Sequence, residues 1–209
     1  MTIFAAVGEA HKLEPREAGL QATHQALNRL GTVSPIFGLV IVPHRYDPQQ
    51  VLSGVSSLLT NVPLLGFSSF AGLTSNGTCF NTVVVALLGG ESIRAETHWF
   101  AAYSQASGEM AARIMQLLGY EQHLADSILV FADGLNGSAE DFCAGIPASL
   151  PLLGGLSSGD LQSGSSFQIA SLQSGRGAMG AAFLRGNIRA GIGYGHGWTP
   201  VGNHFRVTR

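Results

Sequence analysis

The sequence has little positive charge and a single lysine. Lys12 is that lysine, and 11 Lys and Arg residues face 13 Asp and Glu residues, which gives a formal net charge of -2. Proteins that hold nucleic acid or an anionic lipid surface through charge need a basic patch or stripe. The composition therefore excludes nucleic acid as an expected partner and gives no electrostatic reason to expect membrane binding.

Long hydrophobic runs and a secretory leader are also missing. No apolar run approaches the ~20 residues that a bilayer span requires, and the first residues lack the basic start and long apolar stretch of a signal peptide. We therefore expect a cytoplasmic protein with no membrane partner. The two cysteines, Cys79 and Cys143, match no metal spacing, which favours small, half-buried hydrophobic side chains in a reducing compartment.

The familiar catalytic and cofactor motifs are absent as well. The chain contains no G-x-x-x-x-G-K-[ST], no G-x-S-x-G, no H-E-x-x-H and no Cys/His metal spacing. A hydrolase or transferase with Ser158 or Cys143 as nucleophile would need a histidine within hydrogen-bond reach, and no spacing in the sequence supplies one. These absences predict a protein that is not an enzyme, holds no metal and needs no cofactor.

Glycine, in contrast, is abundant, at 28 residues against a usual share of about 7%. The glycines gather after residue 134 with Ile, Val and Leu between them, which is typical of short strands joined by tight turns. Glu14-Pro15 and Asp47-Pro48 predict the starts of two helices, on either side of a buried strand at residues 36–42. Residues 82–88 and 93–99 are predicted to form a β-hairpin.

The second half of the chain repeats the order of the first at an offset of about 90 residues. Pro-Leu-Leu-Gly occurs at 63–66 before a Ser-Ser pair and again at 151–154 before another, and residues 186–198 echo residues 93–99. The sequence therefore predicts an α/β (α+β) fold of two pseudo-symmetric half-domains from an internal duplication, about 1–99 and 100–209. We expect helices packed on mixed β-sheets.

In such a fold the equivalent loops converge near the pseudo-axis, and ligands bind at the carboxyl ends of strands. Glycines there let the main chain approach a ligand, and serines and acids add polar partners. The predicted ligand-binding residues are Ser68, Ser69, Asp133, Gly134, Gly154, Gly155, Ser158, Asp160, His196 and Trp198. Two other interpretations stay open: Asp133 as a turn residue, and the alternating glycines at 191–197 as a close packing contact between the halves.

Five segments together resemble the N-terminal region of the FIST family. They are LVIVPHRYDPQQVL, PLLGFSSFAGL, ILVFADGLNGSAEDF, LPLLGGLSSGDL and GHGWTPVGNHFRVTR. The resemblance covers nearly the whole chain and implies a single FIST N-terminal-like domain made of two repeats. Family members usually continue into a C-terminal domain, so the resemblance also implies that this partner domain is absent from the 209 residues.

The resemblance implies a sensory domain of a bacterial signal-transduction protein. Its expected ligand is an amino acid or a similar small polar molecule, and its expected protein partners are the C-terminal domain or other signalling proteins. One alternative is a haem-binding nitric oxide sensor that uses a single histidine, His196 or His204. A second is a protein-interaction scaffold, which an exposed apolar patch would favour.

Overall fold

The computed structural model describes residues 2–120, 125–160, 162, 164–193, 195, 197–202 and 205–206. Its first part contains β1 (Phe4–Ala10), α1 (Pro15–Leu30), β2 (Pro35–Pro43), α2 (Pro48–Ser56), β3 (Leu64–Ser69), β4 (Ala71–Thr74), β5 (Gly77–Phe80) and β6 (Val83–Gly89). Its second part contains β7 (Ile93–Phe100), α3 (Ser107–Tyr120), β8 (Ser127–Asp133), α4 (Ala139–Ala144), β9 (Leu152–Ser157), β10 (Gln168–Ala170), β11 (Gln173–Gly175) and β12 (Met179–Gly186).

The two parts have the same topology, and we call them the first and second units. Four strands of the first unit lie in the order β1-β6-β2-β3, and four of the second lie in the order β7-β12-β8-β9. In each unit the last strand pairs antiparallel with the first two strands, and the second strand pairs parallel with the third. The predicted α/β fold with two duplicated, pseudo-symmetric halves and mixed sheets is thereby confirmed.

The predicted β-hairpin at residues 82–88 and 93–99 is wrong. Both segments are strands, but β6 pairs with β1 and β2, whereas β7 pairs with β12 in the other sheet. Because β6 already has a partner on each edge, the chain leaves the first sheet after Gly89 and β7 opens the second unit. The segment at residues 186–198, which echoes residues 93–99, begins at the last residue of β12, and its described residues beyond Gly186 form no helix or strand.

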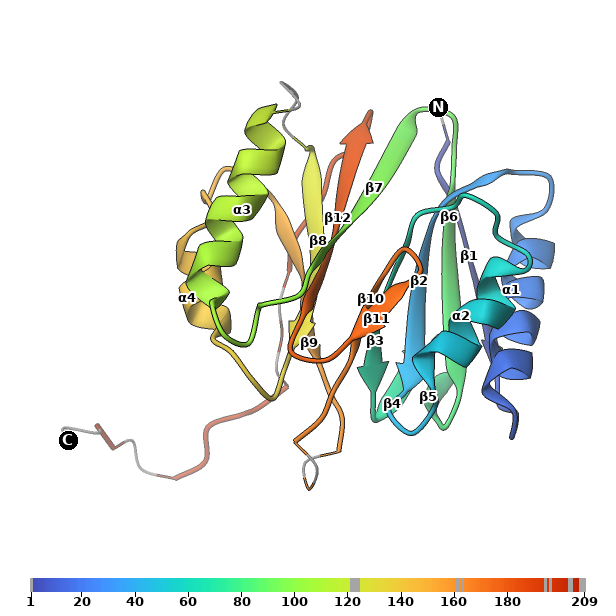
Figure 1. Cartoon of the computed structure of the whole chain (residues 1–209), viewed down its shortest axis with the longest axis horizontal. Coiled ribbons are helices and arrows are strands. Elements are labelled where there is room, and N and C mark those ends of the chain that lie inside the picture. Colours follow the sequence, from blue (N-terminus) through green and yellow to red (C-terminus); the bar gives the residue numbers. More distant parts are fainter. Residues whose placement is uncertain are drawn as a thin grey trace.

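The units pack sheet against sheet, with their helices outside. In Figure 1 the layers run from α3 and α4, through the two sheets, to α1 and α2. One apolar cluster lies between each sheet and its helices, and a third lies between the sheets. In that third cluster the rings of Phe67 and Phe131 stack with their centroids 4.0 Å apart. Burial between two sheets explains why the strands are continuous apolar runs.

Helix α2 shows how local sequence sets one element. The Asp47 side chain accepts a hydrogen bond from the Gln49 amide at 2.8 Å, and Pro48 takes the first helical position. The buried face of the helix packs closely on α1, because a Cβ built at Gly54 would lie 2.1 Å from the Arg16 carbonyl oxygen. In the described part of the chain, no helix is both long and apolar enough to span a membrane.

Candidate functional site

The equivalent serine turns of the two units do meet. The Ser158 amide donates to the Ser68 carbonyl oxygen at 3.0 Å, and the Ser68 hydroxyl donates to the Ser158 carbonyl oxygen at 2.8 Å. The Phe70 amide donates to the Ser158 hydroxyl at 2.9 Å. The ends of β3 and β9 therefore converge as the repeat predicts, and their polar groups bind each other.

Asp133 lies at this junction and is buried, with 2% of its surface exposed. One carboxylate oxygen accepts from the Leu135 amide at 2.8 Å, the Asn136 amide at 3.2 Å and the Ser166 hydroxyl at 2.9 Å. The other accepts from the Asn136 side-chain amide at 3.1 Å and the Gly177 amide at 3.0 Å. The carboxylate thus joins three segments of the second unit, which is the turn role left open by the sequence.

Asp133 belongs to a set of buried polar side chains that we call the polar cluster. Its members are at most 2% exposed and are Ser68, Asp133, Ser157, Ser166 and Gln168. The Gln168 side-chain amide donates to Ser157 at 2.6 Å and to Ser166 at 3.1 Å, and its oxygen accepts from the Ala178 amide at 3.1 Å. Such a satisfied buried network fixes the relative position of the strands that contribute to it.

The other predicted residues near the junction have local roles. Gly134 is needed because a Cβ there would lie 2.3 Å from the Ser157 carbonyl oxygen. The Ser69 hydroxyl donates to the Ala71 carbonyl oxygen at 2.6 Å, and Asp160 accepts from the Gln162 amide at 2.9 Å.

The remaining predicted residues lie outside the junction. Gly154 and Gly155 are exposed positions of β9, and Trp198 follows β12 with 82% of its surface exposed. His196 and His204, the candidate haem ligands, lie outside the described residues. Among the residues that are described, no group of three or more His, Cys, Asp or Glu is placed to hold a metal ion.

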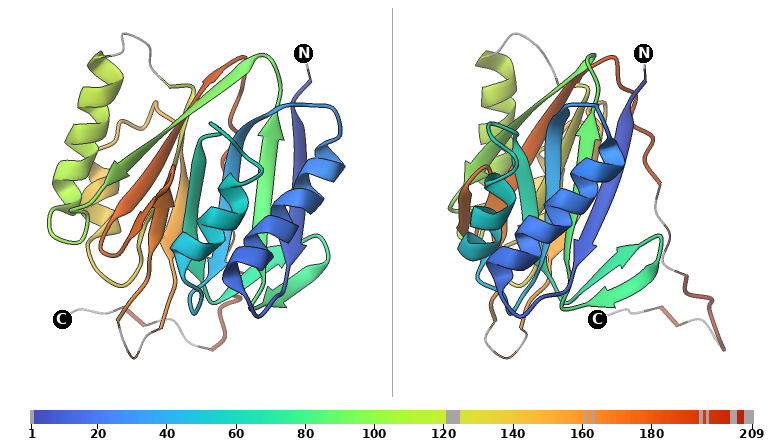
Figure 2. Two further views of the ribbon diagram at one scale, coloured as in Figure 1. Left: turned by 45° about the vertical axis from the view of Figure 1, so that its right-hand side comes forward. Right: turned by 90° about the vertical axis from the view of Figure 1, so that its right-hand side faces the viewer.

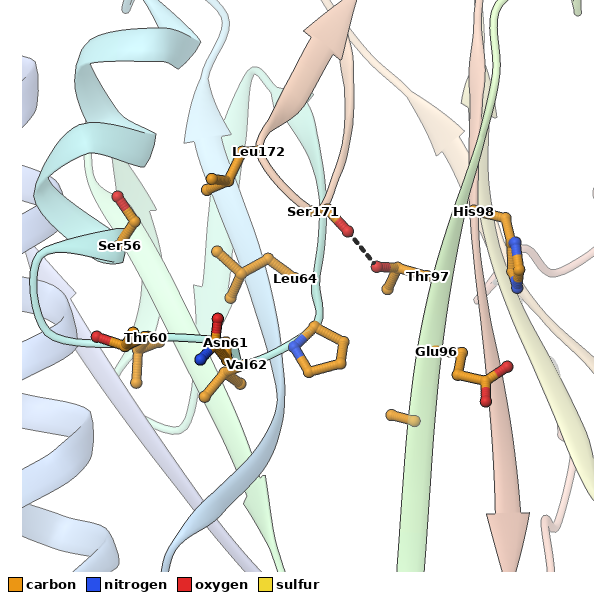
Figure 3. A pocket seen from close by; sticks show the side chains of 13 residues that line it. Ser56, Thr60, Asn61, Val62, Leu64, Glu96, Thr97, His98, Ser171 and Leu172 are labelled. Carbon is orange, nitrogen blue, oxygen red and sulfur yellow. Dashed lines mark hydrogen bonds between the residues drawn. The ribbon is translucent and has the colours of Figure 1, made fainter.

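A groove between the two units, rather than the serine junction, offers space for a ligand. It has a volume of about 750 Å³, within the range of small-molecule sites. We call it the inter-unit groove. One wall is the α2–β3 connection, residues 57–63, and the other is β7, with the turn between β10 and β11 at its edge (Figure 3). Both units therefore line it.

The polar groups in this groove are mainly hydroxyls and an amide. Thr97 on β7 and Ser171 share a hydrogen bond of 2.7 Å between their hydroxyls, which ties the β7 wall to the β10–β11 turn at the edge of the groove. Asn61 adopts a left-handed backbone, with φ of 60°, at the bend before β3. Figure 3 shows Thr97 pointing toward Ser171, with Glu96 on the other side of β7.

Among the described lining residues, the one carboxylate is already paired. Glu96 lies 2.7 Å from the Arg185 guanidinium, and neighbouring His98 packs its ring on Phe183 with centroids 4.5 Å apart. Lysine and arginine are missing from the described lining. The groove is therefore suited to a neutral molecule with hydrogen-bonding groups, because a free carboxylate or ammonium would find no opposite charge inside it.

Sequence reasoning missed the groove residues. Asn61 before Pro63 is typical of a helix end, so that position carried a signal, although α2 ends earlier, at Ser56. Thr97 and Ser171 are 74 positions apart and lie together only because β7 and the β10–β11 turn cross between the units. Their pairing has no local sequence pattern.

Known proteins resemble the chain in family and in fold. The family model described as FIST N domain matches residues 36–209. Among curated proteins, none matches the chain. A crystal structure of cyanuric acid hydrolase from A. caulinodans is similar at 10% identity, with a TM-score of 0.42, over 89% of this chain and 72% of that one. A cyanuric acid hydrolase structure described as innovation by structural concatenation is similar at 10% identity, with a TM-score of 0.39, over 87% and 68%.

Both of these structures are of a hydrolase. The prediction that the chain is not an enzyme is therefore corrected, because the proteins it is similar to in structure are enzymes. At 10% identity and these TM-scores, the likeness gives this chain neither a reaction nor a substrate.

Proposed function

The chain belongs to the FIST N domain family, whose members are signal-transduction sensory domains, and we propose that it binds a small polar molecule in the inter-unit groove. The observation that carries the proposal is that both units line this space. A ligand that contacts both walls binds some arrangements of the two units more tightly than others. It therefore shifts the population toward the arrangement for which its affinity is highest. Binding there would turn ligand concentration into a change that a neighbouring signalling domain can detect.

The chemistry of the lining selects the ligand class. Hydroxyls of Thr97 and Ser171 and the amide of Asn61 both donate and accept hydrogen bonds, while Leu64 and Leu172 provide apolar contact. Neutral polar molecules without a free carboxylate or ammonium suit these groups better than charged ones. A free amino acid carries both charges at neutral pH, so the lining favours an uncharged amide, alcohol or nucleobase over it. The haem alternative depends on histidines outside the described residues, and no observation on the described part of the chain favours it.

Asn61→Gly is the most direct test of the groove. Glycine keeps the left-handed backbone and removes the side chain with its amide. We expect ligand binding to weaken about tenfold, the effect of losing one hydrogen bond worth about 1.4 kcal/mol. Calorimetric titration and thermal shift with uracil and glycerol, each compared with glutamate and lysine, measure the effect.

Asn81→Gly is the matched control, because Asn81 also has a positive φ, of 52°, and lies outside the groove. It should leave binding unchanged. The proposal fails if no neutral probe raises the melting temperature, or if Asn61→Gly binds as tightly as the control.

A further inference from the structure

The third strand of the first unit has its outer edge covered by the second unit. Strand β10 pairs antiparallel with β3, with Ile169 opposite Gly66. The Ser171 amide donates to the Leu64 carbonyl oxygen at 2.7 Å, and the Ser68 amide donates to the Phe167 carbonyl oxygen at 2.8 Å. A hairpin strand from the neighbouring unit thus completes this edge.

The equivalent strand of the second unit, β9, has no such cover. It is the last strand in the order β7-β12-β8-β9, and no strand of the described chain pairs with its outer edge. The Ile128 amide bonds the Pro151 carbonyl oxygen, so by ladder alternation Gly154 and Leu156 turn their main-chain groups outward. Both residues are exposed, Leu156 at 51%. We call residues 152–156 the β9 edge.

The space beneath that edge is also unfilled. In the first unit, Phe167 and Ile169 from the β10 segment join the core between the sheet and α2. In the second unit, the corresponding place between β9 and α4 is a mostly apolar cavity of about 210 Å³. It is lined by Phe142 and Cys143 of α4 and by Tyr103, whose buried hydroxyl has no hydrogen-bond partner within normal geometry.

The chain carries a hairpin of the kind that this edge requires. The β4–β5 hairpin has the same place in the first unit as β10–β11 has in the second, but it forms a two-stranded sheet of its own. Figure 2 shows it projecting from the body of the molecule. Its large apolar side chains are exposed, Leu73 at 76% and Phe80 at 55%, as is Phe70, directly before β4, at 61%. Exposed apolar groups on a projecting hairpin mark an interaction surface.

We propose that the β4–β5 hairpin of one copy adds antiparallel to the β9 edge of a second copy. Main-chain hydrogen bonds would complete the edge, and an apolar side chain of the hairpin would enter the cavity beside Tyr103. This reproduces between copies what β10, Phe167 and Ile169 do within one chain. The contact is head-to-tail, so each copy offers one hairpin and one edge, and repetition gives a ring or a longer assembly. It does not depend on the ligand proposed for the inter-unit groove.

Sedimentation velocity of the 209-residue chain across a wide range of concentrations tests this docking. We expect the mass to rise with concentration. Leu73→Lys on the hairpin and Leu156→Lys on the edge should each weaken association about tenfold or more, since each replaces an apolar contact with a charge. Both positions are more than half exposed, so folding should survive, and circular dichroism and thermal melting verify this.

The controls add the same charge away from the contact. Leu13→Lys lies before α1, 94% exposed, and Leu172→Lys lies at the inter-unit groove, 61% exposed. Both should associate like the wild type. A protein that stays monomeric at every concentration overturns the proposal, and so does association that both hairpin and edge variants leave unchanged.

Discussion

At the scale of single residues, the buried polar groups divide into satisfied and unsatisfied ones. Asp133 accepts five hydrogen bonds, whereas the hydroxyl of Tyr103 has no partner within normal geometry. The Ser107 hydroxyl donates to the Tyr103 carbonyl oxygen at 2.7 Å and accepts from the Ser138 amide at 2.9 Å. Removing a group that accepts hydrogen bonds leaves its buried donors without a partner, which lowers the free energy of unfolding. Removing a buried group that makes no hydrogen bond changes this free energy little.

Asp133→Ala should therefore lower the free energy of unfolding by about 3 kcal/mol, since several donors would be left buried without an acceptor. Urea denaturation measures this loss. Glu91→Ala, an exposed carboxylate in the turn before β7, should change stability by no more than about 0.5 kcal/mol. Equal effects for the two variants would show that the Asp133 network does not hold the fold together.

Tyr103→Phe should leave stability at neutral pH unchanged or slightly higher. Burial raises the pKa of the Tyr103 phenol above 10.0, Cys143 adds to the rise, and Ser107 opposes it. The unfolded chain then ionises first, so wild-type stability is complete below pH 10.0 and falls as the pH rises from there through the folded pKa. Melting temperatures of both proteins from neutral to alkaline pH should diverge above about 10; parallel curves would refute this.

At the scale of elements, close helix packing decides whether replacing a helical glycine by alanine lowers or raises the free energy of unfolding. Gly54→Ala should destabilise by about 1–3 kcal/mol, because its Cβ would lie 2.1 Å from the Arg16 carbonyl oxygen on α1. Gly119 of α3 has nothing within 4 Å of a built Cβ, so Gly119→Ala should stabilise by about 0.5–1 kcal/mol through helix propensity. Thermal denaturation of both variants distinguishes the two effects, and a stabilising Gly54→Ala would contradict the packing.

Local signals predicted the elements well, but they could not predict which strands would pair. The cap at Asp47 and the apolar run after Pro35 were readable in the sequence, as was the repeat. The sheet that β7 joins could not be predicted, because β6 pairs with two strands at distant positions in the chain and not with its neighbour in sequence. The serine turns met as predicted, yet the side chain of each serine bonds a main-chain group of the opposite turn and is not left free for a ligand. The groove is formed by residues of both units that are far apart in the sequence, so no periodic pattern in the sequence predicts it.

At the scale of the whole molecule, the duplication explains why the outer edge of β3 is covered and that of β9 is not. The second unit covers an edge of the first, while the β9 edge and the β4–β5 hairpin lack strand partners in the described chain. The same packing of unit on unit creates the inter-unit groove. The ligand site and the docking surface proposed above therefore lie at separate places in the molecule.

The most direct measurement is a titration of isotope-labelled protein with a neutral polar ligand, followed by nuclear magnetic resonance. Binding in the inter-unit groove predicts that signals of Asn61, Thr97 and Ser171 shift together, with one common affinity. Shifts confined to residues around Tyr103, with these three unchanged, would contradict the account.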